Sequence, residues 1–437
     1  MEVKRLLIVG TVPYKKNAPS RAFESYFSNW PRHSIAQIFS NPQQPFKGHC
    51  NTLFQVTDKM LLKRWFNSKS HVGKVYHFDK LTAEGSQAPS KDHTNSIISM
   101  LYSAGAKHTP LTHLLRALLW KKNFWCTDEL NIWLERFNPD CVFLSFSDDF
   151  FILDIAMYVA EKFDIPIVST ISDDYYFNDR KSISPLYYIY RVKYKKLVNK
   201  IFKKYKYAIY ISDKIRDKYN GYFGLKGDTV YLTSELERRN FRSININNPK
   251  VRYFGNITLD RYLSIIDIAK VLKSINPQYC IDVYSGIITD DIKAKFDSCG
   301  NIVYHNAIPY AEVKELTSDS DILLVLEGFT EHNINSTRYS LSTKAADSLQ
   351  SGVNVFAYGS KECGLIDYLL KYDACVVCTE KEELKASLLD LIKNEEVQKK
   401  YYDKSMEIVR NHHNIETSTG ITRSIINQAI EDWTKTH

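Results

Sequence analysis

A long hydrophobic run is missing from this 437-residue sequence. A helix that spans a bilayer needs about 18 or more consecutive apolar residues, so no membrane-spanning segment is predicted. The apolar stretch within residues 1–10 is too short for a signal peptide, and Glu2 lies where such a peptide carries positive charge. The stretch is typical of a first buried strand. We therefore expect a cytoplasmic protein.

Several motifs of common enzymes are also absent. The sequence has no Gly-x-Gly-x-x-Gly after its first strand, no Walker loop, no His-Glu-x-x-His and no Gly-x-Ser-x-Gly, which argues against dehydrogenases and hydrolases. Its eight cysteines are scattered, as expected for reduced thiols. The one Cys-x-x-Cys, Cys375 to Cys378, lacks a second pair of ligands at zinc spacing, and its apolar centre favours a buried strand.

The length and the charge distribution divide the chain in two. A chain of 437 residues is longer than one core usually supports, so two domains are expected. Residues 1–250 contain 38 Lys and Arg against 23 Asp and Glu, a net charge of +15, while the remaining 20 basic and 27 acidic residues give −7. The two halves therefore differ in electrostatic character.

Most of the basic excess lies between Arg180 and Lys206, where ten Lys or Arg occur with no acidic residue. Aromatic residues are interleaved with these charges. A helix of this kind can contact an anionic membrane through its cations and rings, which we predict for Lys193, Lys195, Lys196, Lys200, Lys203 and Lys204. The alternative is a solvated helix whose aromatics pack inward. Nucleic-acid binding would need a recognised fold such as a helix-turn-helix, and none is visible.

Apolar runs alternate with helical patterns along the chain. Expected strands occur at 6–9, 142–146, 166–169 and 208–211 in the first half and at 251–254, 281–284, 302–304, 322–326, 353–357 and 374–377 in the second. Apolar strands that do not alternate with polar residues, separated by helices, favour parallel sheets covered on both faces. The fold class is therefore α/β, with two doubly wound, Rossmann-like domains.

The expected domains are residues 1–245 and 250–415, followed by a helix at 416–437. Asn and Pro replace periodic apolar residues at 242–250, which indicates a linker. Residues 40–125 depart from the alternating pattern and include the polar segment 81–90, so a surface insertion carrying acceptor specificity is expected there.

One segment combines an apolar strand, an acidic loop and a short helix that Gly352 closes. The strand ends at Leu326, and Glu327 and Glu331 lie in the loop that follows. The helix begins near Ser342, Thr343 and Lys344. Backbone N–H groups at a helix start attract anions, and Lys344 adds a formal charge.

This segment resembles the donor-binding region of GT-B glycosyltransferases, especially the retaining family 4 and its capsule and O-antigen relatives. The matching residues are Ser342, Lys344, Asp347 and Gly352. The resemblance implies that Lys344 holds the donor diphosphate and Asp347 the ribose. The family usually has glutamate where this chain has Asp347, and a second glutamate where it has Tyr339. Glu327 or Glu331 is the expected substitute for the second one.

The start of the second domain carries a related resemblance. After the strand at 251–254 come Gly255, Asn256 and Arg261, where family members have glycine, arginine and lysine. The resemblance implies that Arg261 binds donor phosphate, which suits its bidentate guanidinium. Ile308 is a further expected donor contact. A surface arginine after a glycine turn is the alternative, and the matching position of Lys344 favours the functional interpretation.

Two acidic pairs, Asp148-Asp149 and Asp173-Asp174, follow expected strands of the first domain. They should lie at the carboxyl edge of its sheet, where one carboxylate of the first pair orients or deprotonates an acceptor and the second pair faces acceptor or phosphate. Arg21, in the first strand-to-helix loop, is expected on the same side. Helix or loop capping is the alternative role for the aspartates.

The resemblance implies a GT-B enzyme with a cleft between its domains, moving a sugar from a UDP- or GDP-linked donor to a growing or lipid-linked surface glycan. In such enzymes fixed charge and helix N-termini replace a metal, so neither metal nor cofactor is expected, and retention is implied. Expected partners are the nucleotide sugar, the acceptor glycan and an anionic membrane at the inner face of the plasma membrane, without nucleic acid. A sugar-nucleotide 2-epimerase and a non-catalytic, degenerate transferase that acts as a membrane or assembly partner remain as alternatives.

Overall fold

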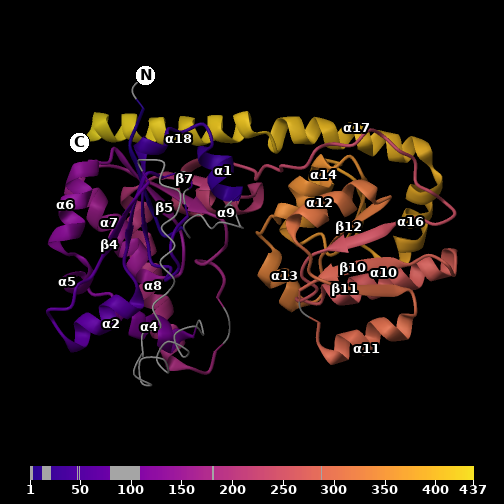
Figure 1. The fold of residues 1–437 in the computed structure, drawn as a ribbon, viewed down its shortest axis with the longest axis horizontal. Coiled ribbons are helices and arrows are strands. Elements are labelled where there is room, and N and C mark those ends of the chain that lie inside the picture. The colour runs from indigo at the N-terminus through magenta and orange to yellow at the C-terminus, as the bar shows by residue number, and fades with distance from the viewer. Residues whose placement is uncertain are drawn as a thin grey trace. The chain divides into compact units, whose positions relative to one another are not determined.

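The structure is a computed structural model that describes residues 3–11, 21–46, 48, 50–78, 109–179, 182–286 and 288–437. It divides into two units, one made of residues 1–229 and 419–437 and the other of residues 230–418. Each unit is built on one sheet with helices around it (Figure 1). The expected segment 81–90 lies outside the described residues.

The first unit has an eight-stranded sheet in the order β4-β3-β2-β1-β5-β6-β7-β8. Neighbouring strands are parallel except β3 and β4. The strands are β1 (Leu6–Val9), β2 (Ile35–Phe39), β3 (Thr52–Gln55), β4 (Lys74–His77), β5 (Cys141–Ser145), β6 (Ile167–Ile171), β7 (Tyr207–Tyr210) and β8 (Lys226–Thr229). The helices are α1 (Arg21–Phe27), η1 (Arg32–Ser34), α2 (Asp58–Phe66), α4 (Pro110–Leu119), α5 (Lys122–Trp125), α6 (Asp128–Phe137), α7 (Phe150–Phe163), α8 (Pro185–Lys204), α9 (Asp213–Phe223) and most of α18 (Ile415–Thr436).

The second unit has a six-stranded parallel sheet in the order β11-β10-β9-β12-β13-β14. Its strands are β9 (Val251–Phe254), β10 (Ile281–Ser285), β11 (Ile302–Asn306), β12 (Ile322–Leu326), β13 (Asn354–Tyr358) and β14 (Val376–Cys378). Its helices are α10 (Arg261–Ile275), α11 (Asp290–Cys299), α12 (Tyr310–Asp319), α13 (Glu331–Thr337), α14 (Thr343–Gln350), α15 (Gly364–Lys371), η2 (Lys381–Glu383), α16 (Leu384–Lys393) and α17 (Glu395–His412).

The central strands are buried along their whole length. Every residue of β1, β6, β7, β12 and β13 is buried, as expected for parallel strands that helices cover on both faces. Cys375 and Cys378 are likewise buried, at the last strand of the second sheet, and every described cysteine is a free thiol.

Part of the expected insertion belongs to the first sheet. Residues 52–77 form β3, α2 and β4, so this portion is not a surface addition. These strands are short and mix polar with apolar residues, and β4 is an antiparallel edge strand, which is why the apolar-run pattern missed them.

The residues after β8 pack on the second unit, which is why the division falls at residue 229 rather than at the expected 245. Arg238 donates to the carbonyls of Leu349 and Tyr402 at 2.8 and 2.5 Å. Arg239 donates to the carbonyl of Ser320 at 2.5 Å. These arginines bind backbone carbonyls of α14, α17 and the end of α12, so the linker-like segment at 242–250 lies inside the second unit.

The last helix, α18, packs against the amino edge of the first sheet from Thr419 onward. Asp432 accepts hydrogen bonds from Tyr207 and Lys226, the first residues of β7 and β8. The indole of Trp433 stacks on Tyr205 at 5.3 Å and donates to the carbonyl of Asp164. The carboxyl edge of the sheet is therefore left to other elements.

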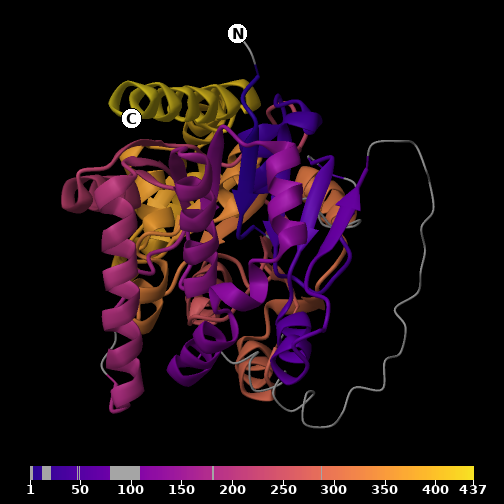
Figure 2. The same cartoon turned by 90° about the vertical axis from the view of Figure 1, so that its left-hand side faces the viewer.

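Helix α8 stands along one side of the first unit, as Figure 2 shows. Its aromatic side chains Tyr187, Tyr190, Tyr194 and Phe202 are buried, and so is Tyr205 just beyond it, so they are not available to a membrane as the sequence had suggested. Of the lysines predicted to contact a membrane, Lys195 pairs with Asp179, and the other five are exposed. No helix among the described residues is long and apolar enough to cross a membrane.

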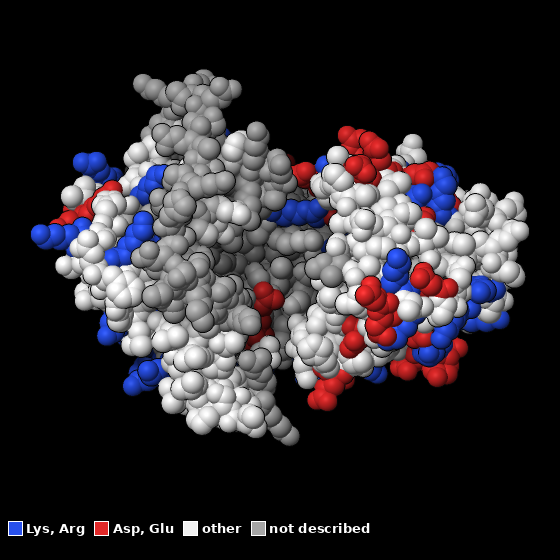
Figure 3. Space-filling model, turned by 60° about the horizontal axis from the view of Figure 1, so that its bottom comes forward, with Lys and Arg blue, Asp and Glu red and all other residues white. Residues whose placement is uncertain are grey.

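Charged side chains are distributed differently over the two units. On the face drawn in Figure 3, acidic and basic side chains are interspersed over the second unit. On the described flank of the first unit, most of the charged side chains in the same view are Lys and Arg. This agrees with the opposite net charges of the two halves of the sequence.

Candidate active site

The second sheet changes direction between β9 and β12. β10 and β11 follow one another on one side of β9, whereas β12, β13 and β14 lie on its other side. β9 and β12 pair only at their first two residues, Val251 with Ile322 and Arg252 with Leu323. Their carboxyl ends therefore part. Open parallel sheets bind ligands outside the carboxyl ends at such a point.

Arg261 and Glu327 form a buried ion pair where these strands part. Arg261 begins α10, and Glu327 directly follows β12. The guanidinium donates from Nε and Nη2 to the two carboxylate oxygens at 2.9 and 3.1 Å, and Glu327 is only 3% exposed. Within the described residues, Nη1 of Arg261 makes no hydrogen bond, so the guanidinium keeps donors for an anion.

The turn that leads into α10 is held in an unusual conformation. Leu259 and Asp260 have φ angles of 55° and 60°, which non-glycine residues adopt only at a cost of about 1–3 kcal/mol each. Thr330 donates to Asp260 at 2.6 Å, and the Asn333 amide donates to the Leu259 carbonyl at 2.7 Å. The loop after β12 thus fixes the turn after β9.

Burial raises the pKa of Glu327 above its usual value, although Arg261, Asn333 and Lys344 act in the opposite direction. The folded protein therefore binds a proton at Glu327 more tightly than the unfolded chain does. The ionised form depends on the neighbouring positive charges. Any anion that competes for those charges will raise the pKa further.

Lys344 and Gly255 come together although they belong to two separate motifs. A Cβ at position 255 would stand 2.2 Å from Lys344 Nζ, and Gly255 has a φ of 140°. The ammonium donates to the hydroxyl of Tyr253 at 3.1 Å and lies 4.7 Å from the centre of its ring. The absence of a side chain at Gly255 is therefore what lets the ammonium reach the end of β9.

The helix that carries Lys344 also presents other predicted donor-binding residues. Ser342 caps α14, because its hydroxyl accepts from the backbone N–H of Lys344 at 3.3 Å. Thr343 is the exposed first residue of the helix. Asp347 accepts hydrogen bonds from Ser234 at 2.6 Å and Tyr310 at 3.3 Å, so its carboxylate is held in place.

The remaining predictions for this unit lie at its loops. Asn256 is exposed in the turn after β9, where its side chain accepts from the N–H of Thr258. Ile308 is half-buried in the loop between β11 and α12. Glu331 is exposed in the first turn of α13 and takes no part in the Arg261 ion pair. Of the two loop glutamates, Glu327 is the one that the fold places beside the basic residues.

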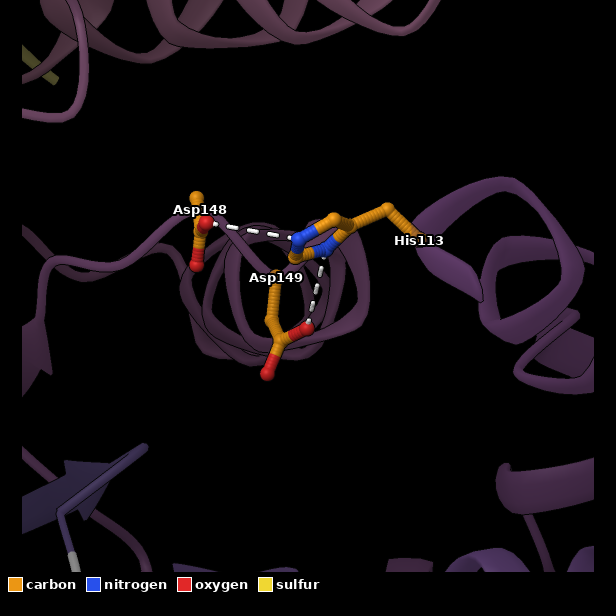
Figure 4. A group of neighbouring side chains, drawn as sticks. All are labelled: His113, Asp148 and Asp149. Carbon is orange, nitrogen blue, oxygen red and sulfur yellow. Dashed lines mark ion pairs between the residues drawn. The ribbon is translucent and has the colours of Figure 1, made fainter. Parts of the chain in front are cut away.

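The first sheet has its own change of direction, between β1 and β5, and Asp148 and Asp149 follow β5 there. His113 of α4 lies between the two carboxylates (Figure 4), with Nε2 at 3.4 Å from Asp148 and Nδ1 at 3.6 Å from Asp149. Its side chain is 6% exposed. Arg116, one turn along α4, donates from Nη1 to both oxygens of Asp149 at 2.7 and 2.9 Å.

The two aspartates differ in environment. Burial of Asp149 opposes its ionisation, but the nearby His113 imidazole and the charge of Arg116 outweigh this effect, so the pKa of this carboxyl is lowered. Asp149 makes no side-chain cap of α7, which removes the capping alternative for this residue. Asp148 lines a cavity of about 180 Å³, whereas Asp149 does not. The cavity-facing carboxylate is therefore Asp148.

This cavity lies between α4, α8 and the loop after β6. It is lined by Pro110, His113, Asp148, Asp174, Tyr175, Asn178, Tyr187, Tyr190 and Arg191. The ring of Tyr190 stacks on His113 at 4.8 Å. Arg191 donates to the carbonyls of Tyr175 and Tyr176 at 2.7 and 2.5 Å and fixes the loop. Rings, carboxylates and a guanidinium around a small cavity suit a polyhydroxylated ligand.

The other predicted residues of the first unit have more peripheral positions. Asp174 lines the cavity, but its carboxylate accepts from Tyr219 and from the N–H of Phe177, both at 2.8 Å, and thereby shapes the loop. Asp173 is exposed beside it, and Arg21 begins α1; neither lines the cavity.

Sequence reasoning missed His113, Arg116, Tyr190 and Arg191. His113 and Arg116 fell within residues 40–125, which were interpreted as an insertion and searched only for acceptor specificity. Because the sequence separates α4 from β5 by two further helices, no local spacing linked His113 to Asp148.

The ligand atoms of His113, Asp148 and Asp149 lie within 4.8 Å of one another, which is the spacing of a metal site. The two carboxylates, however, already face groups of the protein itself. Each imidazole nitrogen faces a different carboxylate, and Arg116 already neutralises Asp149. The imidazole thus lies between Asp148 and Asp149, at 3.4 and 3.6 Å from their carboxylate oxygens.

Comparison with known proteins identifies the fold. No family model matches the chain, and no curated protein matches its sequence. Solved structures do match. An α,α-trehalose 6-phosphate synthase from Burkholderia multivorans gives a TM-score of 0.60 at 8% identity, over 99% of this chain and 100% of that one. The glycosyltransferase WaaG, involved in lipopolysaccharide biosynthesis, gives 0.53 at 12%, over 96% and 99%.

A third structure, that of HepE from Anabaena in complex with UDP and glucose, gives a TM-score of 0.56 at 11% identity, over 98% of this chain and 100% of HepE. These likenesses extend over both units. They confirm the predicted fold class: the chain has the GT-B fold, with two Rossmann-like domains. At such low identities the comparisons establish the fold, and the activity has to be inferred from the residues of the site.

Gly255→Ala is expected to destabilise the second unit by about 1–3 kcal/mol, because alanine is strained at this φ. The new Cβ also displaces the Lys344 ammonium. Gly286→Ala is the matched control, since its Cβ would meet only Ala307 at 3.7 Å and its φ is ordinary. Urea denaturation measures both. Equal stability of the two variants would show that the close approach at Gly255 is unimportant.

Proposed function

We propose that the protein is a glycosyltransferase that moves a sugar from a nucleoside diphosphate to a glycan acceptor. The observation that carries this proposal is that Gly255, Arg261 and Lys344 lie together where the strand order of the second sheet reverses, between β9 and β12. Two cations and a glycine turn form a phosphate-binding group. In this proposal Asp347 binds the ribose, which the resemblance to family 4 supports.

The chemistry needs stabilisation of a departing nucleoside diphosphate. Charge that is already fixed at the leaving phosphate lowers the barrier, because no reorganisation is needed as negative charge develops. Lys344 and the Nη1 side of Arg261 supply such charge, and the start of α14 adds backbone N–H groups. We propose a metal-independent, retaining transfer on the strength of the family 4 resemblance; NMR of the product anomer tests the retention.

The donor and the acceptor are proposed by class. The HepE structure holds UDP and glucose, which makes UDP-glucose the first donor to test. The cavity at His113 and Asp148 is proposed to bind the acceptor sugar, with Asp148 accepting the hydrogen of its hydroxyl. A lipid-linked or growing surface glycan at the inner face of the plasma membrane fits the exposed lysines of α8.

A panel of UDP-, GDP- and CMP-sugars tests the activity through slow donor hydrolysis and nucleotide binding. Lys344→Met is expected to weaken nucleoside diphosphate binding about 10- to 100-fold, because a hydrogen bond to a charged group contributes about 1.5–3 kcal/mol. Calorimetry measures this change in affinity, and Lys385→Met, at an exposed position of α16, is the control. Binding without hydrolysis or transfer would support the non-catalytic alternative, and no binding of any nucleotide would reject the proposal.

Nucleotide binding is also expected to be accompanied by uptake of a proton at Glu327. Phosphates that draw on the charge of Arg261 and Lys344 raise the pKa of Glu327 further, so the carboxylate becomes protonated between its free and bound pKa values. Calorimetry of UDP binding in two buffers with different ionisation enthalpies gives the proton count. Glu327→Gln removes the uptake, and Glu331→Gln retains it. A zero count in the native protein contradicts this coupling.

Asp148→Asn is expected to lower kcat by about 10²- to 10⁴-fold, the usual contribution of a positioned acid or base. Nucleotide affinity should stay unchanged, because the nucleotide binds to residues of the other unit. Steady-state kinetics and calorimetry separate the two effects. Asp217→Asn is the control, since that carboxylate is 66% exposed on α9. A variant with native kcat would show that the His113 cavity is not the acceptor site.

A further inference from the structure

Helix α4 exposes a row of leucines beside the cavity. Its inner side carries His113 and Leu119, which are buried. Leu111, Leu115 and Leu118 lie four and three residues apart and are 50%, 50% and 48% exposed, so they form one stripe on the outer side. Three large apolar side chains in a row on a surface helix are unusual unless the surface meets an apolar partner.

The first half of α8 repeats this feature. Leu186, Ile189 and Val192 follow one another at intervals of three residues and are 37%, 47% and 68% exposed. Ile183, just before the helix, is fully exposed. The buried side of the same half carries Tyr187 and Tyr190, which line the cavity. α8 therefore turns one side to the cavity and an apolar side to solvent.

These exposed residues belong to neighbouring elements. α4 packs against α8, and α2 packs against α4. The end of α2 adds Trp65 and Phe66, which are 48% and 70% exposed. We call the apolar residues of the three helices the outer apolar surface. Because α4 and α8 also wall the His113 cavity, this surface adjoins the cavity.

Basic side chains continue the surface along α8. The exposed residues of its second half include Lys193, Lys196 and Lys203, which have no ion-pair partner within the described residues. No acidic residue occurs at 182–206 or at 109–122. One exposed side of α8 is thus apolar in its first half and cationic in its second.

We propose that the outer apolar surface docks on an anionic lipid bilayer, with the leucines of α4 and the apolar residues of α8 entering the interface and the α8 lysines meeting lipid phosphates. A shallow apolar insertion joined to a cationic patch is the pattern of proteins that lie on a membrane without crossing it. The inference deepens the membrane contact in the proposed function and gives it specific residues. The lipid contact then comes from α2, α4 and α8 rather than from the buried tyrosines.

Charge complementarity favours a bilayer over a second copy of this chain. A two-fold dimer through this surface would bring the same lysine-bearing side of α8 against its equivalent, without acidic residues from α4 or α8 to offset the charge. An anionic bilayer supplies phosphates for the lysines and an apolar layer for the leucines.

Sedimentation with phosphatidylcholine vesicles containing phosphatidylglycerol tests this surface. The native protein is expected to sediment with anionic vesicles and much less with pure phosphatidylcholine or at high salt. The variant Leu111→Glu, Leu115→Glu, Ile189→Glu should lower the bound fraction at least about tenfold, since charge is expelled from the interface. Ile246→Glu, at a 56% exposed position of the second unit, is the matched control.

A second variant, Lys193→Glu, Lys196→Glu, Lys203→Glu, tests the cationic part and should abolish the preference for anionic vesicles. Circular dichroism and thermal unfolding check that both triple variants are folded. Native-level sedimentation of the leucine variant overturns the proposal. A dimer in light scattering that the same variant dissociates also overturns it and assigns the surface to self-association. Vesicle binding by a protein that binds no nucleotide would reject the proposed function and leave the surface standing.

Discussion

The buried ion pair between Arg261 and Glu327 is the interaction on which the second unit's site depends. It joins the first residue of α10 to the residue after β12, across the point where two neighbouring strands part. A buried ion pair is a poor source of net stability, because desolvation of both charges offsets their attraction. Its value here is placement. The ion pair holds the guanidinium of Arg261 at the carboxyl ends of the parallel strands and leaves its Nη1 available for an anion.

The first unit also pairs an arginine with a carboxylate where the strand order of its sheet reverses, between β1 and β5. Arg116 and His113, both on α4, hold Asp149, and His113 extends from there to Asp148 at the cavity. In both units a carboxylate after a central strand is neutralised by an arginine at a helix, with Glu327 buried and Asp149 20% exposed. The difference is in what remains exposed. The second unit presents positive charge, whereas the first presents a carboxylate and a ring of aromatic residues.

Sequence reasoning succeeded where one local pattern decides the structure. β9 and β12 were predicted to the residue, because a short, largely apolar run bounded by polar segments is typical of a buried parallel strand. It failed where the structure depends on tertiary pairing. β8, with the sequence Lys-Gly-Asp-Thr, has no apolar run and exists as a strand because β7 pairs with it. The choice between Glu327 and Glu331 also depends on a tertiary contact, because the sequence allowed either glutamate at the site and only the fold pairs Glu327 with Arg261.

The basic excess of the first half of the chain is concentrated in and around α8, and the structure shows where the side chains of this helix lie. The sequence showed a basic stretch with interleaved aromatics and allowed either a solvated helix or a membrane contact. The tyrosines pack inward, as expected for a solvated helix. Leu186, Ile189 and Val192 are exposed, which a membrane contact would use. An inward-packed ring cannot enter a bilayer, so any lipid contact has to come from the aliphatic side chains. Those side chains belong to the two helices that also wall the cavity, which ties the position of a membrane surface to the position of the proposed acceptor.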